Sequence, residues 1–345
     1  MKRHLVLNLF LFAFLTGLIV VSVPGRSAAQ EVIKLNYANF FPAPSPHSVM
    51  IEAWGKEIEK RTDGRVKVTY FHGGTLAPAD QIYDSVVKGI CDLGLSCFAY
   101  TRGKFPLTEV IDLPIGLQDG PTATGLINAY YKKFKPKELD GVKVLYLHAH
   151  GPGLIHTTKK PINKLEDLKG MKIRATGLAS KIALALGAAP VGTTMPETYD
   201  ALRTGVAEGA MAPFMALKDF KWGEVVSYSI KNYSSSYSTG FFIIMNKKKW
   251  DALPPDVQKI VEKVDEEWID KTGVLWDTTD QDGIKFITDR GVKLISQSKE
   301  EGDRWAAAVR PLLDNYVAVM KKQNLPGEEA LKFSLDYIKA NQKAK

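Results

Sequence analysis

The sequence has only two cysteines among 345 residues, which excludes a disulfide-stabilised scaffold. Cys91 and Cys97 stand in the run CDLGLSC, which has the pattern of an extended strand. An extended chain separates their Cα atoms by roughly 20 Å, at about 3.3 Å per residue, whereas a disulfide requires less than about 7 Å. We therefore expect two free, buried thiols.

The motifs of common enzymes are also absent. The sequence contains no G-x-S-x-G elbow, no phosphate-binding loop and no H-E-x-x-H pair. His148 and His150 share one face of a strand-like run, but no third metal ligand stands near them in the sequence. We therefore expect neither an enzyme nor a bound metal or other cofactor. A secreted α/β hydrolase is the alternative of another class, and it would need a nucleophile and a base that the sequence does not display.

Beyond residue 23 the sequence has no apolar run long enough to cross a membrane. The one long run, from Leu5 to Val23, follows two basic residues and precedes Ser27-Ala28-Ala29. This pattern is typical of a secretory signal peptide cleaved after Ala29, although the run is also long enough for a membrane anchor. We expect a periplasmic protein that is not embedded in the membrane once the signal has been removed.

The charge of the mature chain is mildly basic. Removing residues 1–29 leaves 316 residues (345 − 29) and takes away three basic residues but no acidic one, so the formal net charge falls from +8 to +5. This balance suits an anionic ligand or an acidic membrane partner. The basic residues are scattered and are not interleaved with aromatic residues along one element, which argues against nucleic acid as a partner.

Strand-like and helix-like patterns alternate along the mature chain in two series. The first series has expected strands at 33–41, 65–71, 92–100 and 142–149 and helices at 48–61, 78–90 and 122–134. The second has strands at 154–158, 171–175 and 190–194, a short apolar stretch at 208–213, and helices at 178–186, 197–204 and 214–222. The very apolar run 241–245 suits the middle of a sheet. The remainder is expected to be helical, at 255–288, 300–322 and 328–340.

Two α/β series joined by short crossings near residues 150 and 239 predict a two-lobed α/β fold. Each lobe would be a mixed sheet flanked by helices, with a ligand cleft between the lobes. We expect residues 1–29 to be a signal peptide, residues 30–150 with 240–278 to form lobe I, and residues 151–239 with 279–345 to form lobe II. The long helix near 255–288 would brace both lobes.

Arg174 is the first candidate for a functional residue. It stands at the end of the expected strand 171–175, on the face opposite Ile173, just before the turn at Gly177. The carboxyl ends of strands are where open α/β sheets bind ligands, and a guanidinium is a planar fork that fits a carboxylate. A surface arginine or a structural ion pair is the alternative interpretation.

The strings DLKGMKIRATG, ALALGAAPV and PETYDALRTGVAEG, together with NKKKWDALPPDVQKIV, resemble the DctP-type solute receptors of tripartite ATP-independent periplasmic (TRAP) transporters. The resemblance covers nearly the whole mature chain. It implies the two-lobed periplasmic binding protein fold, a bound organic acid held by Arg174 through its carboxylate, and delivery to a permease with a small and a large membrane subunit. Receptors that feed a sensor kinase or an ATP-driven transporter are the alternatives, and neighbouring genes would distinguish them.

The sequence departs from the family pattern at three positions. Relatives that bind polar acids often have a second arginine where Leu154 or a neighbour stands, an asparagine where Ala212 stands, and an aromatic residue where Met195 stands. A second carboxylate buried there without a charged partner would cost several kcal/mol. We therefore predict a monocarboxylate with an aromatic or bulky apolar tail, of the aromatic 2-oxo acid or arylacetate type. Branched-chain 2-oxo acids and C4-dicarboxylates are the alternatives.

Apolar and aromatic residues at expected strand ends complete the candidate pocket. Those beside Ala212 are Met211, Pro213 and Phe214, of which Met211 and Phe214 are alternatively core residues. Those at other strand and loop ends are Phe40, Phe41, His47, Phe98, Tyr100, His150 and Tyr237. His47 or His150 is expected to donate a hydrogen bond to the carboxylate or to a 2-oxo group. Glu197 is interpreted as a helix cap rather than a ligand contact.

Overall fold

The structure is a computed structural model that describes residues 32–342, so the predicted signal peptide and its cleavage site after Ala29 lie outside the described residues. The strands are β1 (Ile33–Asn39), β2 (Val66–Phe71), β3 (Leu93–Cys97), β4 (Val142–Ala149), β5 (Leu154–Thr157), β6 (Lys172–Arg174), β7 (Ala189–Val191), β8 (Gly209–Ala212), β9 (Tyr228–Lys231), β10 (Gly240–Asn246) and β11 (Lys293–Ser296).

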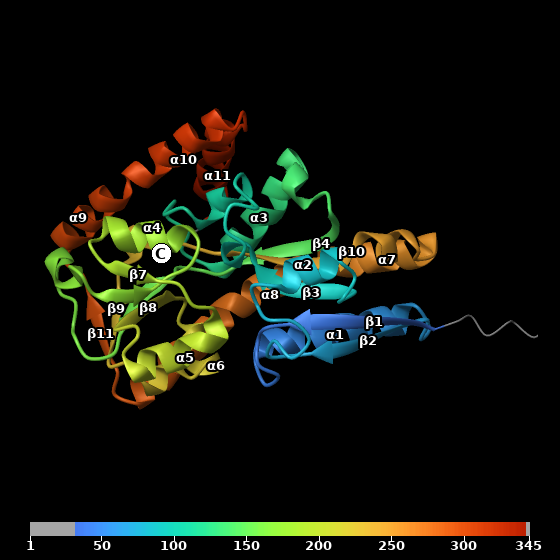
Figure 1. Ribbon diagram of the computed structural model, residues 1–345, viewed down its shortest axis with the longest axis horizontal. Coiled ribbons are helices and arrows are strands. Elements are labelled where there is room, and N and C mark those ends of the chain that lie inside the picture. The colour runs from blue at the N-terminus through green and yellow to red at the C-terminus, as the bar shows by residue number, and fades with distance from the viewer. Residues whose placement is uncertain (1–31, 343–345) are drawn as a thin grey trace, which may run out of the picture. The chain divides into compact units, whose positions relative to one another are not determined.

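The α-helices are α1 (Pro46–Arg61), α2 (Ile82–Val87), α3 (Gly120–Phe134), α4 (Leu178–Ala185), α5 (Met195–Thr204), α6 (Met215–Asp219), α7 (Lys247–Asp251), α8 (Pro255–Asp289), α9 (Lys299–Val309), α10 (Pro311–Lys322) and α11 (Gly327–Asn341). Short 3₁₀ turns are η1 (Phe98–Tyr100), η2 (Thr108–Asp112), η3 (Lys137–Leu139), η4 (Leu165–Leu168), η5 (Trp222–Glu224) and η6 (Tyr233–Ser235). Figure 1 shows their arrangement.

The first sheet has the strand order β2-β1-β3-β10-β4. Strands β1, β2 and β3 are parallel, whereas β10 runs antiparallel to both of its neighbours, β3 and β4. All seven residues of β10 are buried, as expected for a strand inside a sheet that is covered on both faces. The prediction that this apolar run lies in the middle of a sheet is confirmed.

The second sheet has the order β11-β9-β5-β8-β6-β7. Here β6 is parallel to β7 and β8, and β5 is antiparallel to β8 and β9. An isolated bridge between Gly153 and Tyr237 joins the two segments that cross from one sheet to the other. Two mixed sheets flanked by helices are the predicted two-lobed α/β fold, which the structure confirms.

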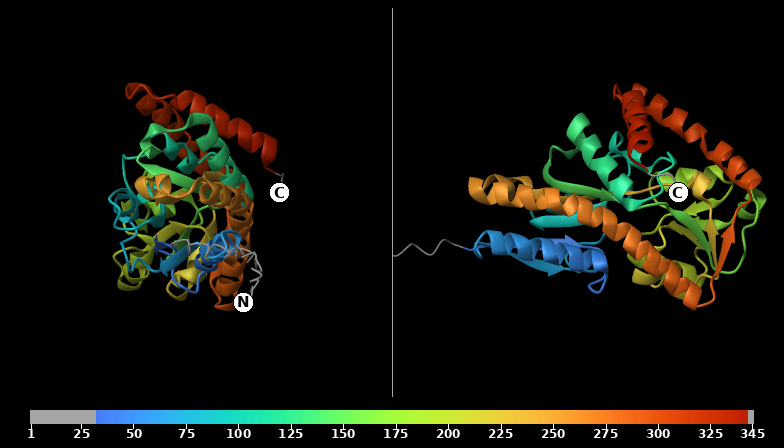
Figure 2. Two further views of the ribbon diagram at one scale, coloured as in Figure 1. Left: turned by 90° about the vertical axis from the view of Figure 1, so that its right-hand side faces the viewer. Right: turned by 180° about the vertical axis from the view of Figure 1, so that it is seen from behind.

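Helix α8 contacts elements of both sheets. It packs against α1, α3 and β4 of the first sheet's side and against α6 of the second's. Figure 2 shows it, in orange, running along the molecule from one side to the other. On the first side, the indole N–H of Trp54 in α1 donates to the Asp265 carboxyl over 2.8 Å. On the second side, Gly283 allows the backbone of α6 to approach closely.

The C-terminal helices extend over both sheets in the same way. Helix α9 packs against η6, η4 and α4, whereas α11 packs against α3 and η2, and Figure 1 shows α9 to α11 in red above the two sheets. The predicted boundaries assigned all of residues 279–345 to lobe II. The contacts of α11 argue for placing it with the first sheet instead, and the remaining lobe boundaries stay a prediction.

Three sequence-based expectations about elements were wrong. Strands β9 and β11, which pair with each other in parallel, were not predicted, because β11 lies at the sheet edge and each strand carries few apolar residues. The expected helix 300–322 is two helices, since Pro311 lacks the N–H that a continuous helix needs. The expected helix 78–90 is reduced to α2, which ends before Gly89 at a positive φ of 75°.

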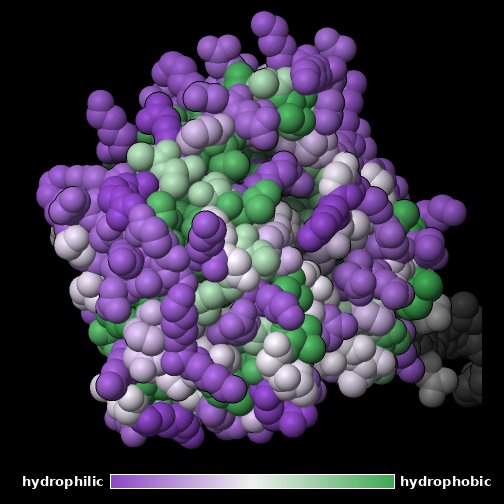
Figure 3. Space-filling view, turned by 60° about the vertical axis from the view of Figure 1, so that its left-hand side comes forward, coloured by the Kyte–Doolittle hydropathy of each residue, from purple (hydrophilic) through white to green (hydrophobic). Residues whose placement is uncertain are grey.

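The face shown in Figure 3 is mainly hydrophilic at its rim, and hydrophobic side chains are exposed between polar ones, with several of them gathered near its middle. No helix within residues 32–342 is long and apolar enough to span a bilayer. Cys91 and Cys97 are both buried and free, which confirms the prediction for the two thiols.

Candidate functional site

A cavity lies where strands of both sheets end. The first sheet contributes residues that follow β1, end β3, follow β4 and begin β10, and the second contributes the ends of β6 and β8. The cavity has about 380 Å³ of empty space, part of it open to solvent. Its lining residues are Phe40, Phe41, Cys97, Tyr100, His150, Arg174, Thr176, Met195, Met211, Ala212, Pro213, Tyr237, Thr239, Phe241 and Trp276.

Arg174 is the last residue of β6 and is 3 % exposed. Its Nε donates to the carbonyl of Thr193 over 2.9 Å, and one terminal nitrogen donates to the carbonyl of Met211 over 3.3 Å. The other terminal nitrogen, Nη2, is buried and has no hydrogen-bond partner within residues 32–342. The Trp222 ring centroid lies 5.5 Å from the guanidinium carbon. Buried donors in folded proteins normally have a hydrogen-bond partner, so the free position of Nη2 calls for an explanation.

No carboxylate within residues 32–342 forms an ion pair with Arg174. The other lining side chains include no acid and no second arginine or lysine. Burial raises the pKa of the Cys97 thiol and of the Tyr100 and Tyr237 hydroxyls, so these groups are uncharged at neutral pH. Arg174 is therefore the one charged side chain among the residues that line the cavity.

Aromatic rings form much of the remaining wall. Phe40 stacks on Phe41 with ring centroids 4.4 Å apart, and Phe241 lies 5.1 Å from Trp276 of α8. Tyr100 meets Phe40 edge-on at 5.8 Å. Rings held by each other in this way present a rigid apolar surface to a planar or bulky ligand.

His150 follows β4 and is buried, and its ring lines the cavity. Its Nδ1 lies 2.5 Å from the carbonyl oxygen of Gly151. Because a carbonyl oxygen only accepts, Nδ1 carries the proton. Burial lowers the pKa of His150 to about 4, so the ring is neutral at pH 7 and its Nε2 is an acceptor. A neutral ring in this tautomer accepts at Nε2 and does not donate there, which argues against the expected hydrogen bond from His150 to the ligand.

Ten of the fourteen residues predicted for the pocket line this cavity. They are Arg174, Ala212, Met211, Pro213, Met195, Phe40, Phe41, Tyr100, His150 and Tyr237. Among the three positions of departure from the family pattern, Met195 begins α5 and its N–H donates to the Tyr100 hydroxyl over 2.9 Å. Glu197 accepts from both the N–H and the hydroxyl of Thr194 at the start of the same helix, which confirms its interpretation as a cap.

The other four predicted residues do not line the cavity. Leu154 is fully buried and pairs with Ala212 across the antiparallel strands β5 and β8. Phe98 packs in the core against Phe105 and Phe242, at 4.9 and 5.3 Å.

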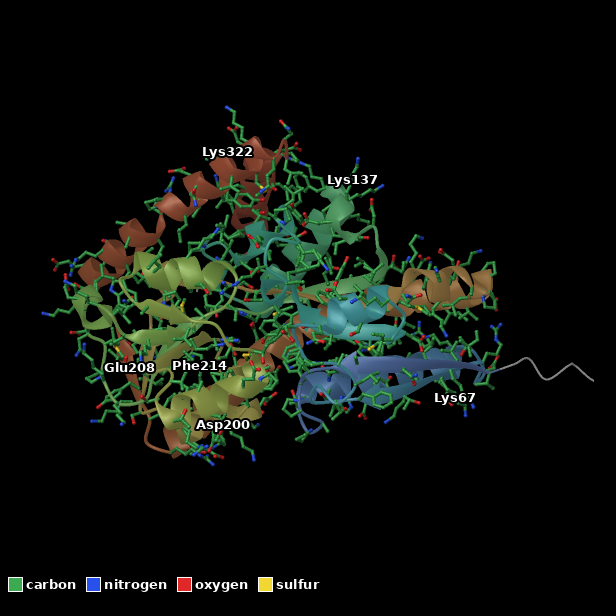
Figure 4. All side chains as sticks on the ribbon, viewed as in Figure 1. Lys67, Lys137, Asp200, Glu208, Phe214 and Lys322 are labelled. Carbon is green, nitrogen blue, oxygen red and sulfur yellow. The ribbon has the colours of Figure 1, made fainter. Side chains whose placement is uncertain are left out.

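His47 lies behind the wall, stacked on Phe41 at 4.8 Å and 4.1 Å from Trp276. Burial lowers its pKa to about 3. Phe214 lies among the second-sheet elements in Figure 4 and lines a separate hollow that also includes Pro152, Tyr233 and Ile284. Each of the four residues that do not line the cavity packs against other apolar or aromatic side chains. Their positions at strand ends therefore did not determine where their side chains lie.

Five lining residues were missed by sequence reasoning: Cys97, Thr176, Thr239, Phe241 and Trp276. Thr176 directly follows the predicted strand 171–175, so the strand-end rule applied to every side chain would have found it. Cys97 ends β3 but lies inside the longer predicted strand 92–100, so the rule would have missed it. Phe241 lies near the start of β10. Because β10 runs antiparallel to β3, the start of β10 lies at the same edge of the sheet as the end of β3, and the sequence does not reveal that direction. Trp276 reaches the cavity from the middle of a helix, and no local pattern indicates that.

The structure shows no arrangement suited to a metal among residues 32–342, where no group of three or more His, Cys, Asp or Glu side chains lies close enough to hold one. Instead, the imidazole Nδ1 of His148 accepts from the indole N–H of Trp276 over 3.0 Å.

Comparison with known proteins identifies the family. Residues 37–319 match the model of the DctP family, described as bacterial extracellular solute-binding protein, family 7. A TRAP periplasmic solute-binding protein of Desulfovibrio salexigens is 34 % identical, with 91 % of this chain and 98 % of that one covered and a TM-score of 0.78.

Two further relatives differ in their ligands. A marine metagenome TRAP solute-binding protein specific for aromatic acid ligands, solved with 3-hydroxybenzoate, is 27 % identical over 91 % of this chain and 100 % of that one, with a TM-score of 0.86. The 2,3-diketo-L-gulonate-binding periplasmic protein YiaO of Escherichia coli is 25 % identical over 71 % of this chain and 74 % of its own length.

The fold, the cavity between the two sheets and the extent of the family match agree. Proteins of this family are periplasmic solute-binding receptors and not enzymes. The chain therefore belongs to the DctP family, the extracellular solute receptors of TRAP transporters.

Proposed function

We propose that this TRAP receptor binds a monocarboxylate with an aromatic or bulky apolar tail, of the aromatic 2-oxo acid or arylacetate type. One observation carries the proposal: a single buried guanidinium, with Nη2 unpartnered among the described residues, faces a cavity whose other lining groups are uncharged. The carboxylate would accept from Arg174, and the tail would lie against Phe40, Phe41 and Phe241.

Polar diacids fit this cavity poorly. A second carboxylate would meet side chains such as Met211, Ala212 and Trp276, and burying an ion without a partner is unfavourable by several kcal/mol. Apolar contact, in contrast, contributes about 25 cal/mol for each Å² removed from water. The relative specific for aromatic acids supports this preference, and the sugar-acid receptor of E. coli defines the competing ligand class.

Binding would proceed without chemistry. We propose that the ligand shifts the receptor from an open to a closed arrangement of the two sheets, and that the crossings near residues 150 and 239 act as the hinge. The closed form would then dock on the permease in the membrane. The mature protein would be periplasmic, following cleavage after Ala29.

The test is a thermal-shift and calorimetric screen of the mature protein, refolded to remove carried-over ligand. Phenylpyruvate, phenylacetate and benzoate form one arm, branched-chain 2-oxo acids a second, and succinate, malate and a sugar acid a third. A ligand at about 100 times its Kd stabilises the folded protein by roughly 2.7 kcal/mol. Shifts confined to the third arm would refute the proposed ligand class, and silence in all three would refute carboxylate binding itself.

A further inference from the structure

The cavity holds a second polar group with an unused hydrogen-bonding position. His150 is 2 % exposed, its ring lines the cavity, and its one hydrogen bond within residues 32–342 is the one from Nδ1 to the Gly151 carbonyl. The ring is held by edge-on contacts, with Tyr237 at 5.5 Å and Trp276 at 5.8 Å. It therefore cannot turn to exchange its two nitrogens without breaking this packing and the bond to Gly151.

The tautomer follows from this geometry. Nδ1 donates, so in the neutral ring Nε2 presents a lone pair and no proton. A lone pair beside a carboxylate would repel it, so His150 does not share the carboxylate with Arg174. The two groups instead offer opposite chemistry within one cavity: Arg174 a donor for an anion, and His150 an acceptor for an O–H or N–H group.

We infer that His150 makes the receptor select acids whose apolar tail carries a hydroxyl group, which donates to Nε2. The inference rests on the proposed function, because it assumes that an acid binds with its carboxylate at Arg174. An acid without the hydroxyl would leave a buried acceptor unpaired, and sites built to bind a hydroxyl discriminate against analogues that lack it. The ligand class is thus narrowed from aromatic acids to hydroxylated ones.

Matched acids test this inference directly. Calorimetry of the stripped wild type would compare phenylacetate with its 2-, 3- and 4-hydroxy forms and with mandelate, and benzoate with the three hydroxybenzoates. We expect at least one hydroxylated acid to bind about tenfold or more tightly than its parent. A parent acid that binds as tightly as every hydroxylated form would overturn the inference while leaving the proposed function intact. Failure to bind any of these acids would overturn the inference, and failure to bind phenylpyruvate as well would overturn the proposed ligand class.

Two substitutions separate the two nitrogens of the ring. In His150→Asn the side-chain amide can replace Nδ1 as donor to Gly151, but nothing replaces Nε2. In His150→Gln the amide oxygen can occupy the place of Nε2. We expect H150N to lose the roughly tenfold preference for the hydroxylated acid over its parent, and H150Q to keep that preference, so the ratio of the two Kd values within each variant is the readout. A preference that survives in H150N would overturn the inference, because some other group must then accept the hydroxyl.

Discussion

The Arg174 guanidinium is oriented before a ligand arrives. Two backbone carbonyls, of Thr193 and Met211, accept from it, and the Trp222 ring lies beside it. Because these contacts fix the side chain, little conformational entropy remains to be lost on binding. Nη2 is left for the ligand, so the carboxylate is recognised by a donor in a fixed place rather than by a mobile charge.

Replacing Arg174 should therefore remove binding. Arg174→Ala leaves the ligand carboxylate buried without a partner, and loss of one member of such a pair costs about 2–5 kcal/mol, so we expect Kd to rise by about thirtyfold or more. Arg174→Lys keeps the charge but not the planar fork and should recover only part of the affinity. Arg203→Ala, which removes an exposed arginine paired with Asp200, is the control. Wild-type affinity of R174A in calorimetry would contradict the assignment.

For single residues, the sequence indicated which side chains stand at strand ends better than it indicated whether they point into the cavity or into the core. Arg174 was placed at the cavity because strand ends of open sheets meet there, whereas Ala212 was placed there by the resemblance to the family. Phe98 directly follows β3 of the first sheet, so the same reasoning placed it at the cavity, yet it packs into the core. The position of Trp276 depends on how α8 lies across β4, which is a tertiary contact that no spacing in the sequence encodes.

Among the elements, α8 depends on glycine where it meets α6. A Cβ added at Gly283 would overlap the Phe214 carbonyl group and would lie 3.0 Å from the Met215 nitrogen. These are backbone atoms, so the contact cannot be relieved by turning a side chain, and α6 would have to move away from α8. The close approach of the two helices therefore requires glycine at this position.

We expect Gly283→Ala to destabilise the protein by about 1–3 kcal/mol or more, although alanine has the higher helix propensity by about 1 kcal/mol. Gly302→Ala in α9 is the matched control, since its added Cβ would lie 3.4 Å from the Ser234 hydroxyl, an ordinary contact. G302A should be neutral or slightly stabilising. Equal unfolding free energies for the two variants in urea titration would show that the α6–α8 contact has little influence on stability.

Asp265 gives the α1–α8 contact a pH dependence. Its carboxyl accepts from Trp54 and is 3 % exposed, and burial raises its pKa to about 8. The folded state thus keeps a proton that the unfolded chain releases near pH 4. Where the folded state binds more protons, stability falls as the pH rises. This contribution to stability is present below about pH 4 and is lost progressively up to about pH 8.

Asp265→Asn keeps the oxygen that accepts from Trp54 but does not titrate. We expect its stability relative to wild type to increase by a few kcal/mol between pH 5 and pH 8, because only the wild type loses stability from this group over that range. Urea unfolding of both proteins at pH 5, 6.5 and 8 measures the difference. If the unfolding free energies of the two proteins change with pH in the same way, the Asp265 carboxyl is not protonated in the folded state.

Long, apolar helices and strands were largely predictable from the sequence, whereas short strands at the edge of a sheet were not. Strand β10 and helix α8 carry their patterns over their whole length. Strand β11, Lys293–Ser296, is half-buried at most and pairs with β9 alone. Its conformation is imposed by a partner strand more than sixty residues earlier, so local periodicity could not reveal it.

For the molecule as a whole, the described structure brings the two sheets into contact beside the cavity. Gly177, at the start of α4, lies so close to Ala99 that an added Cβ would stand 2.8 Å from the Ala99 Cβ. Phe220 lies 5.8 Å from Phe41. The Ser45 hydroxyl, which precedes α1, donates to the Asp219 carboxyl at the end of α6 over 2.6 Å. These contacts are ones that an opening of the lobes would break.

The Ser45–Asp219 bond is suited to testing the proposed closure because neither residue lines the cavity. If the ligand binds the closed form, Ser45→Ala lowers the population of that form, and the apparent Kd rises by the same factor for every ligand. A hydrogen bond to a charged group contributes roughly 1.5–3 kcal/mol, so we expect an increase of about ten- to a hundredfold, with the ranking of ligands unchanged. Ser45 also caps α1, and this second role must be separated from the first.

Ser298→Ala provides that separation. Ser298 caps α9 by accepting from the Glu301 N–H, as Ser45 accepts from the His47 N–H, but within residues 32–342 the Ser298 hydroxyl forms no hydrogen bond across to the first sheet. Loss of either cap should lower stability by about 1 kcal/mol, whereas only S45A should weaken binding. Small-angle scattering with saturating ligand should show contraction of both variants, with S45A requiring more ligand. If S45A and S298A bind equally well, the Ser45–Asp219 bond is already present in the open form, and closure must depend on contacts at the cavity itself.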